Sequence, residues 1–426
     1  MPPPEETRAV SAPAPDSARV ALAVLAAALG YFVDIYDLVL FSVLRVPSLA
    51  ALGVPPGDAN TAAGASILQL QLAGLVLGGV VLGVIADKRG RRAVVFGSIL
   101  LYSLANVANA FVWSVDAYKV IRFVAGFGLA GELGAGITLV SELLPRRRRG
   151  LGTTIVASLG LTGALVAGSL SSFLLKSVGP DGFRWAYGIG GAMGVALLVL
   201  RFGALESGLF ERARAGASAA RFGDLRLLFA SFERVGRMLR VIAIGVPIWF
   251  AGGVLFVFAP EIGKAIGLAE PPTGANTIFW SYLGVVIGDV VSGLVSQLLR
   301  SRRAVVAIFL ALLAATFVGL LLLGGSSSTA FYAWMTAIGF ATGYWVLFVT
   351  LASEQFGTNL RATVTTSAPN FVRGAAIPIS MLWTALKGHG LVAVTLGIGL
   401  STVALSAVSL AFTRETFDAD LDRLET

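Results

Sequence analysis

Twelve stretches of about 20 mainly apolar residues, separated by short polar segments, limit most strongly how this chain can fold. A helix of that length crosses the hydrocarbon of a bilayer and satisfies its own backbone hydrogen bonds there. With 56% hydrophobic and 13% charged residues, the chain is far more apolar than a soluble domain. We therefore predict an all-α membrane protein with transmembrane helices near residues 18–43, 62–86, 93–113, 117–142, 150–175, 183–203, 237–262, 274–299, 304–325, 328–353, 360–385 and 389–412.

A charged loop at residues 87–92 separates the second and third predicted helices. It contains Asp87 and four basic residues, and the chain becomes apolar again at Ala93. Lys and Arg are costly in hydrocarbon, and short loops rich in them stay on the cytoplasmic side. Most of the other Lys and Arg fall on the same side of the predicted topology as this loop, together with both termini. The pattern predicts cytoplasmic termini in a bacterial-type inner membrane.

The same loop carries a sequence motif. Its Gly-x-x-x-Asp-x-x-Gly-Arg-Arg pattern, formed by Gly83, Asp87, Gly90, Arg91 and Arg92, resembles the signature loop of the major facilitator superfamily of transporters. The motif also stands where that family has it, between the second and third helices. The resemblance implies two six-helix bundles, related by an axis along the membrane normal, that work by alternating access.

A weak internal repeat agrees with two bundles. Residues 80–83 (Val-Val-Leu-Gly) align with 290–293 (Val-Val-Ser-Gly), and Ser141-Glu142 aligns with Ser353-Glu354 at nearly the same offset. An amphipathic helix on the membrane surface and a simple connector both fit the apolar spacing in the long polar segment between the halves. We predict a disordered cytoplasmic tail at 1–17, bundles at 18–203 and 237–413, a cytoplasmic linker at 204–236 and a second cytoplasmic tail at 414–426.

A second motif stands at the cytoplasmic end of the fourth helix. Its Ser-Glu-x-x-Pro-x-x-x-Arg-Gly pattern resembles the signature of sugar porters and of organic-ion and metabolite:proton symporters. Each half thus places a glutamate, Glu142 or Glu354, near basic residues, which are Arg91, Arg92 and Arg149 in the first half and Arg302, Arg303 and Arg361 in the second. We predict a reversible cytoplasmic gate, because an exposed ion pair contributes only about 0–1 kcal/mol. Solvated helix ends are the alternative. The family resemblance also implies that Asp87 lies near the start of the eleventh helix.

Charged residues within the predicted spans are the best candidates for function, because such residues are rare in hydrocarbon. Asp34 and Asp37 are three residues apart in the first helix, in a motif that resembles those of metabolite:proton and aromatic-acid symporters. Both are expected in the outer part of the span, at a depth that Arg122 of the fourth helix can reach. We predict that Asp34, Asp37 and Arg122 couple proton movement to transport. A structural ion pair is the alternative.

A second group of residues is predicted to line a central cavity and contact substrate. Glu132 stands in a Gly-Glu-x-Gly pattern like that of metabolite:proton symporters, and Asp289 and Arg373 lie in the middle of the eighth and eleventh spans. The alternatives are a packing hydrogen bond for Glu132 and an internal Asp289–Arg373 pair. The remaining candidates are polar or aromatic residues of the expected cavity helices, namely Asn370, Trp249, Tyr344 and Trp345. For aromatic residues near span ends, a membrane-interface belt is the alternative.

Departures from related motifs narrow the prediction. The seventh span lacks the Gln-Gln pair of sugar porters, and the fifth lacks the Gly-Pro motif of drug:proton antiporters. We predict a proton-coupled symporter of a small organic ion; a uniporter or an exporter of the same fold is the alternative, and a membrane sensor is the alternative outside transport. A single histidine, His389, and no evident nucleophile–base pair argue against an enzyme or a metal cofactor. The net charge of +8 lies in short loops, so the expected partners are substrate, protons and lipid rather than nucleic acid, with the chain a monomer.

Overall fold

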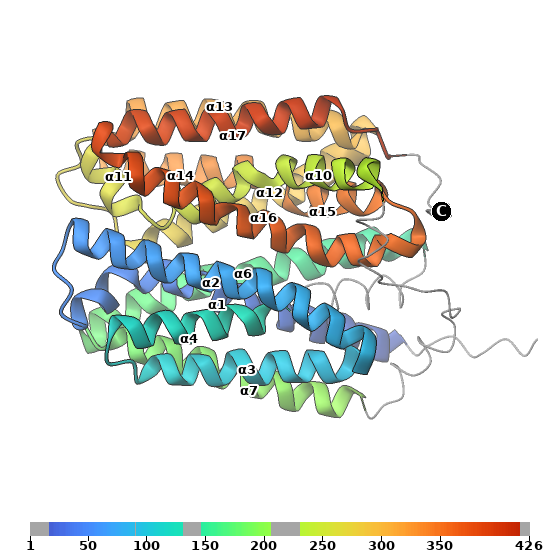
Figure 1. The fold of residues 1–426 in the computed structure, drawn as a ribbon, viewed down its shortest axis with the longest axis horizontal. Coiled ribbons are helices and arrows are strands. Elements are labelled where there is room, and N and C mark those ends of the chain that lie inside the picture. Colours follow the sequence, from blue (N-terminus) through green and yellow to red (C-terminus); the bar gives the residue numbers. More distant parts are fainter. Residues whose placement is uncertain (1–16, 90, 131–145, 206–230, 418–426) are drawn as a thin grey trace, which may run out of the picture.

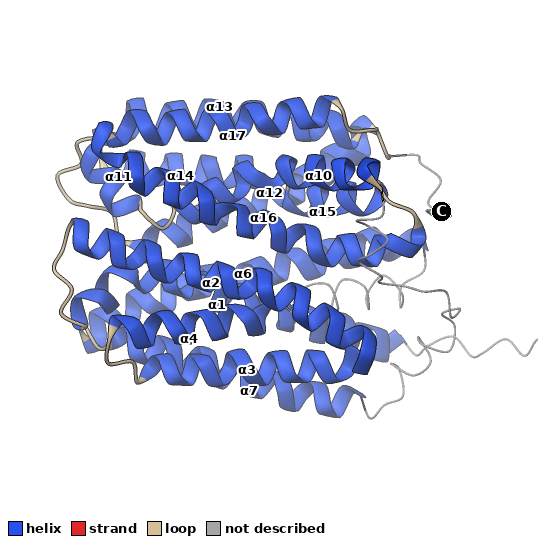
Figure 2. Ribbon diagram, viewed as in Figure 1, coloured by secondary structure: helices blue, strands red, loops and turns tan. Residues whose placement is uncertain are grey.

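The computed structural model describes residues 17–89, 91–130, 146–205 and 231–417 of the chain. Within these residues all regular elements are helices, as Figure 2 shows. They form twelve spans in two bundles of six, drawn one below the other in Figure 1. The long apolar stretches of the sequence thus become helices that lie roughly parallel to the longest axis of the molecule.

The first bundle contains the elements coloured blue to green in Figure 1. They are α1 (Ser17–Ala51), α2 (Asp58–Arg89), α3 (Arg91–Ala110), α4 (Val115–Leu129), α6 (Arg146–Val178) and α7 (Gly182–Leu205). The second bundle consists of α10 (Phe232–Phe250), η1 (Ala251–Leu255), α11 (Ala259–Ala265), α12 (Gly274–Leu299), α13 (Arg302–Leu323), η2 (Gly324–Ser326), α14 (Ser328–Thr342), α15 (Trp345–Glu354), α16 (Thr358–Leu386), η3 (Lys387–His389) and α17 (Leu391–Ala411).

The two bundles repeat one pattern of helix packing. In the first bundle α1 packs on α6, α2 on α4 and α3 on α7. In the second bundle the corresponding spans pair as α10 with α16, α12 with α14 and α13 with α17. The bundles meet where α6 and α1 contact α12 and where α2 contacts α16. Each half is therefore a unit with its own packing, and the seam between the halves is formed by a few helices.

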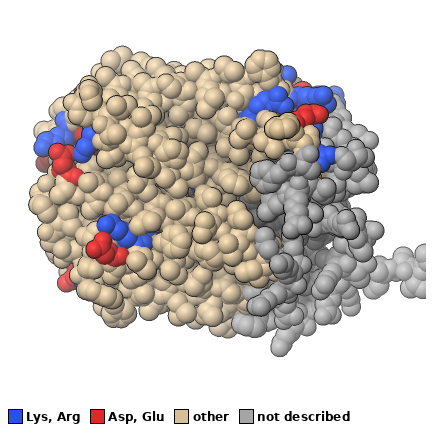
Figure 3. All heavy atoms as spheres, viewed as in Figure 1, with Lys and Arg blue, Asp and Glu red and all other residues tan. Residues whose placement is uncertain are grey.

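Charges gather at the two ends of the bundles. Figure 3 shows Lys, Arg, Asp and Glu near the ends of the long axis of the visible face, with a broad band of other residues between them. Burying that band in lipid removes its apolar surface from water, while the charges at the two ends stay in water. We call the end where α1 begins and α17 ends the terminal end, and the opposite end, which carries the α1–α2 loop, the distal end (Figure 1).

Three spans differ from the sequence prediction. The first helix does not end near residue 43 but continues through Arg45 and Pro47 to Ala51. Asp34 and Asp37 consequently lie near the middle of the apolar span Val24–Ala51 rather than in its outer part. The seventh span passes from α10 into a short π-helix, η1, and the tenth is broken between α14 and α15.

Candidate functional site

A buried ion pair joins the first and fourth spans. Arg122 Nη2 on α4 donates to Asp37 Oδ1 on α1 at 2.8 Å, and both side chains have 0% relative exposure. The same nitrogen donates to Asn106 Oδ1 of α3 at 3.3 Å. Arg122 also lies over the ring of Tyr187 of α7, 5.2 Å from its centroid. One charged pair thus connects four helices of the first bundle.

The hydrogen bonding of this pair is incomplete. Among the described residues, Asp37 Oδ2 and the Nε and Nη1 atoms of Arg122 have no hydrogen-bond partner. Breaking one partner of a buried charge pair costs about 3–5 kcal/mol, because the other charge is left uncompensated. A proton added to Asp37 would remove that attraction, so this pair is able to link a protonation step to the packing of α1 against α4.

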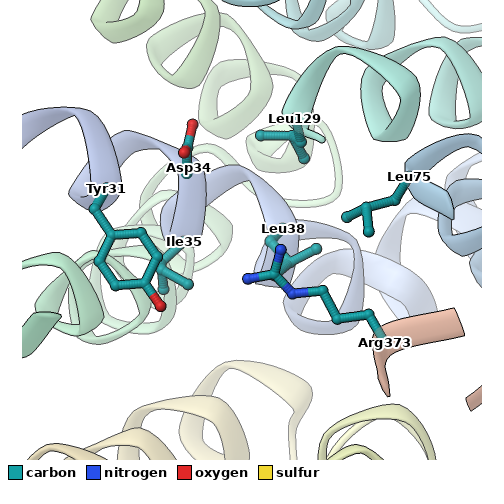
Figure 4. Close-up of a pocket in the computed structure, with 7 residues that line it drawn as sticks. All are labelled: Tyr31, Asp34, Ile35, Leu38, Leu75, Leu129 and Arg373. Atoms are coloured by element: carbon teal, nitrogen blue, oxygen red, sulfur yellow. The ribbon is translucent and has the colours of Figure 1, made fainter. Parts of the chain in front are cut away.

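Asp34 occupies a different environment from Asp37. It lines a small pocket between the bundles together with Tyr31, Ile35, Leu38, Leu75, Leu129 and Arg373. Figure 4 shows Arg373 reaching from α16 toward α1, with the Asp34 carboxylate turned away from it. Arg122 pairs with Asp37 and not with Asp34. Asp37 therefore belongs to the ion pair and Asp34 to the pocket, so the two carboxylates do not share Arg122.

Arg373 lies over the rings of two tryptophans. Its guanidinium carbon lies 5.7 Å from the ring centroids of both Trp249 and Trp345, and Arg373 is 4% exposed. Its Nη1 donates to Asn370 Oδ1 at 3.3 Å, one turn earlier on α16. The predicted candidates Trp249, Trp345, Asn370 and Arg373 are thus brought together beside the pocket.

The acid predicted on the eighth span has another partner. Asp289 Oδ1 accepts the backbone N–H of Val346 at 3.1 Å and so caps the start of α15. Asp289 and Arg373 form no ion pair in the structure, so the internal pair considered from the sequence does not form. Tyr344 is fully buried, donates to the Ile244 carbonyl oxygen at 3.0 Å and does not line the pocket. Glu132 lies outside the described residues.

At the terminal end, Glu354, Arg302 and Arg303 are the charged residues of the predicted gate whose side chains the structure describes. Arg302 Nη2 lies 3.5 Å from Glu354 Oε1, while Arg303 Nη2 donates to the Ala411 carbonyl at 3.2 Å. Glu354 and Arg302 belong to the same bundle, so their pair does not itself join the two halves. Gly83 lies on α2, but the side chains of Asp87, Arg91, Arg92, Arg149 and Arg361, and all of Gly90 and Glu142, fall outside the description.

Residues after α17 pack against the start of α13. Glu415 accepts hydrogen bonds from the Ser301 hydroxyl and from the backbone N–H groups of Arg302 and Arg303. Partial burial by itself would raise the pKa of Glu415, but the Ser301 hydrogen bond and the backbone hydrogen bonds outweigh it and lower the pKa below its usual value. A carboxylate at a helix N-terminus is also stabilised by the helix dipole.

The distal end contains an ionic contact between the bundles that the sequence analysis missed. Arg45 Nη2 of α1 lies 2.7 Å from Glu261 Oε2 of α11, with side-chain exposures of 1% and 21%. Arg45 Nε also donates to the Val257 carbonyl oxygen, and Thr61 Oγ1 of α2 donates to Glu261 Oε1. The predicted spans 18–43 and 62–86 leave Arg45 in the outer loop between them. The sequence does contain one indication of this contact. Glu261 falls inside the predicted seventh span, and a carboxylate there requires a partner.

A second distal ion pair also crosses the seam. Lys387 Nζ lies 2.6 Å from Asp58 Oδ1, but Asp58 has 96% side-chain exposure. Exposed pairs are screened by water and salt, whereas partly buried pairs are screened much less. Arg45–Glu261 is therefore the stronger of the two distal contacts.

Comparison with known proteins places this arrangement in a family. The sequence profile described as Major Facilitator Superfamily matches residues 27–381, which is most of the chain. The chain belongs to the major facilitator superfamily. It is thus an integral membrane protein of a family of transporters, which agrees with the motif at Gly83–Arg92 and with the two six-helix bundles.

Individual relatives and structures are more distant. The inner membrane metabolite transport protein YgcS of Escherichia coli K12 is 28% identical over 80% of this chain and 79% of its own length. The 3-(3-hydroxy-phenyl)propionate transporter of the same organism is 26% identical over 80% of each chain. The inward-open structure of the E. coli xylose transporter XylE has a TM-score of 0.72 at 17% identity, covering 95% of this chain and 99% of XylE. That last likeness concerns the fold alone.

Proposed function

We propose that this protein is a secondary active transporter that carries a small organic ion across a bacterial inner membrane together with protons. The observation that carries the proposal is the fully buried Asp37–Arg122 pair in the middle of the first span. A charge pair at this depth is costly to maintain and is typical of proton-coupled machinery. The similarity to metabolite transporters supports transport of a small molecule.

The position of three charges on α1 supports a coupling mechanism. Asp34 lines the pocket, Asp37 holds Arg122, and Arg45 holds Glu261 across the seam. Eight residues of α-helix separate Asp37 from Arg45, which is about 12 Å along the axis. Protonation of Asp37 weakens its hold on α4, and any resulting shift or rotation of α1 acts on the pocket and on the distal contact together.

The proposed orientation places the termini in the cytoplasm and the distal end in the periplasm. In this orientation the Arg45–Glu261 contact closes the periplasmic side of the pocket. Alternating access then requires this contact to break when the distal side opens and contacts at the terminal end to form. Glu142, Glu354 and their basic neighbours remain the candidates for the cytoplasmic contacts.

Transport by the purified protein in proteoliposomes tests the proposal. Uptake of radiolabelled organic anions, amines and sugars is measured with and without an inward proton gradient, and again with a protonophore. The proposal expects one class to accumulate above equilibrium and to lose that accumulation with the protonophore. Equilibration without accumulation would identify a uniporter. Binding of a ligand without any flux would favour a sensor.

A further inference from the structure

We propose that Asp289 is a second proton-binding site, located in the second bundle, and that its protonation loosens the start of α15. In the first bundle the buried carboxylate of Asp37 is held by an arginine. Asp289 is held instead by the N-terminus of a helix. The inference rests on the proposed function for its role in transport, whereas the site itself can be tested without transport.

Asp289 carries a buried carboxyl group in the middle of a membrane span. It has 2% relative exposure and lies on α12, within the apolar span Gly274–Leu299. Ten residues of helix, or about 15 Å along the axis, separate it from the terminal end of α12. A charged side chain at that depth is costly unless it is paired or neutralised. Asp289 therefore requires either a counter-charge or a proton.

Among the described residues no basic side chain supplies this counter-charge. Asp289 belongs to none of the ion pairs found there, and its Oδ2 atom has no hydrogen-bond partner. Tyr31 of α1 interacts electrostatically with Asp289, but a neutral phenol brings no positive charge. The other charged side chains described on α12 and on the elements that pack closely against it lie in the sites described above or toward the ends of the molecule, and they are Asp34, Asp37 and Arg45 of α1, Lys176 of α6, Glu261 and Lys264 of α11, Arg300 at the end of α12, Arg302 and Arg303 of α13, and Glu354 of α15.

The start of α15 is the partner that Asp289 does have. Asp289 Oδ1 accepts the Val346 N–H at 3.1 Å, and this N–H is one of the first in the helix, which have no partner within it. A helix N-terminus carries about half an elementary positive charge, so it offsets a full negative charge only in part. Burial favours the neutral acid and the helix end favours the carboxylate. A carboxyl group held between two opposed effects is well placed to bind and release a proton.

Close backbone packing keeps Asp289 at this helix end. α12 and α15 lie in the same bundle (Figure 1), and the tenth span breaks between α14 and α15 at Gly343. A Cβ atom on Gly343 would lie 2.5 Å from Gly288 Cα and 2.6 Å from the backbone nitrogen of Asp289. Only glycine fits such an approach. The break therefore lies directly against the residue that caps the next helix.

Protonation of Asp289 changes the strength of this contact more than its shape. The neutral acid can still offer its carbonyl oxygen to the Val346 N–H, but a hydrogen bond to a charged group is about twice as strong as one between neutral groups. The proton comes from bulk water and returns to it. Trp345 begins α15 and lies over Arg373 beside the pocket, so a looser helix start acts on that arginine. Tyr344 keeps its hydrogen bond to the Ile244 carbonyl oxygen and remains an anchor.

Infrared spectroscopy of the purified protein during a pH titration tests the site. A protonated carboxyl group has a C=O stretching band that is separate from the bands of a carboxylate. We expect a band that appears on acidification, disappears on return to alkaline pH and is missing from Asp289→Asn. Glu415→Gln is the matched control, because Glu415 also caps a helix of the second bundle but lies exposed at the terminal end. The Asp289 band should survive in that variant.

Hydrogen exchange at residues 345–348 tests the effect on α15. After correction for the intrinsic pH dependence of exchange, the wild-type rate should rise about 5- to 30-fold as the band appears, because a charged hydrogen bond becomes a neutral one. Asp289→Asn resembles the neutral acid and should exchange fast at every pH. If that variant does not fold, Asp289→Glu keeps a carboxyl group and should shift the midpoint of the band. An unchanged band and midpoint in Asp289→Glu would contradict the assignment.

Three outcomes overturn the proposal. They are that no band depends on Asp289, that its band is present at every pH at which the protein stays folded, and that exchange at α15 does not follow the band. Neither assay needs a substrate or a gradient. A titrating Asp289 in a protein without proton-driven transport would count against the proposed function alone. Proton-driven transport with an Asp289 that does not titrate would count against this inference alone.

Discussion

Glu261→Gln removes the charge from the distal contact while keeping its shape. The Gln amide oxygen can still accept from Arg45, and the hydrogen bond from Arg45 Nε to the Val257 carbonyl oxygen is not touched. In this closed arrangement Arg45 would remain buried, with 1% side-chain exposure, beside a neutral partner. When the distal end opens, water can solvate the same guanidinium. The substitution therefore penalises the closed state and shifts the protein toward a distal-open state.

The expected shift follows from the 2.7 Å contact and its partial burial. A hydrogen bond to a charged group contributes about 1.5–3 kcal/mol net, and a neutral one about 0.5–1.5 kcal/mol. The difference of about 1–2 kcal/mol changes the ratio of the two states about 5- to 30-fold. Salt should reduce the shift only slightly, because the pair is mostly shielded from solvent.

Spin labels on the two bundles measure this ratio. The chain has no cysteine, so Phe111→Cys and Leu322→Cys provide two unique, exposed distal positions on opposite bundles. Glu261→Gln should increase the population of long distances. Asp58→Asn is the matched control, because it removes an exposed ion pair across the same seam and should change the distribution little. Identical distance distributions for Glu261→Gln and the protein with Glu261 would refute the claim that the Arg45–Glu261 contact holds the distal end closed.

Three further changes test other parts of the structure. Gly168→Ala should also favour the distal-open state in the same distance measurement, because its Cβ would lie 2.7 Å from the Ala275 carbonyl oxygen across the seam. Glu415→Gln should lower the melting temperature at neutral pH. That difference should disappear as the pH falls through the lowered pKa of Glu415, since a depressed carboxylate pKa stabilises the folded state only above it. Asp289→Ala should destabilise the protein by about 1 kcal/mol in thermal unfolding, because the Val346 N–H loses its cap.

The helical fold was predictable because length and hydropathy alone decide which segments can cross a bilayer. The family motif at Gly83–Arg92 and the repeat of Ser-Glu also indicated two bundles, as the structure has them. The pairing of Asp37 with Arg122 could also be predicted from the sequence, because two unlike charges at similar depth in hydrocarbon have few other partners.

Contacts that depend on tertiary packing were not predictable. The first helix was expected to end before Arg45, because a lone arginine at that depth is costly; Glu261 is more than 200 residues away and removes the cost. The role of Asp289 depends on where the tenth span breaks, and no glycine–proline pair marks that break. Which groups Asp34 and Asp37 each meet was likewise decided by the helices that pack against α1.

Paired transport measurements on Asp37→Asn test the coupling mechanism most directly. Asn resembles the protonated carboxyl group, so the variant should lose accumulation driven by a proton gradient yet keep counterflow exchange, which requires no net proton release. Asp116→Asn is the control, because its pair with Lys119 is exposed and should not affect either assay. Gradient-driven accumulation by Asp37→Asn at the wild-type level would contradict the account.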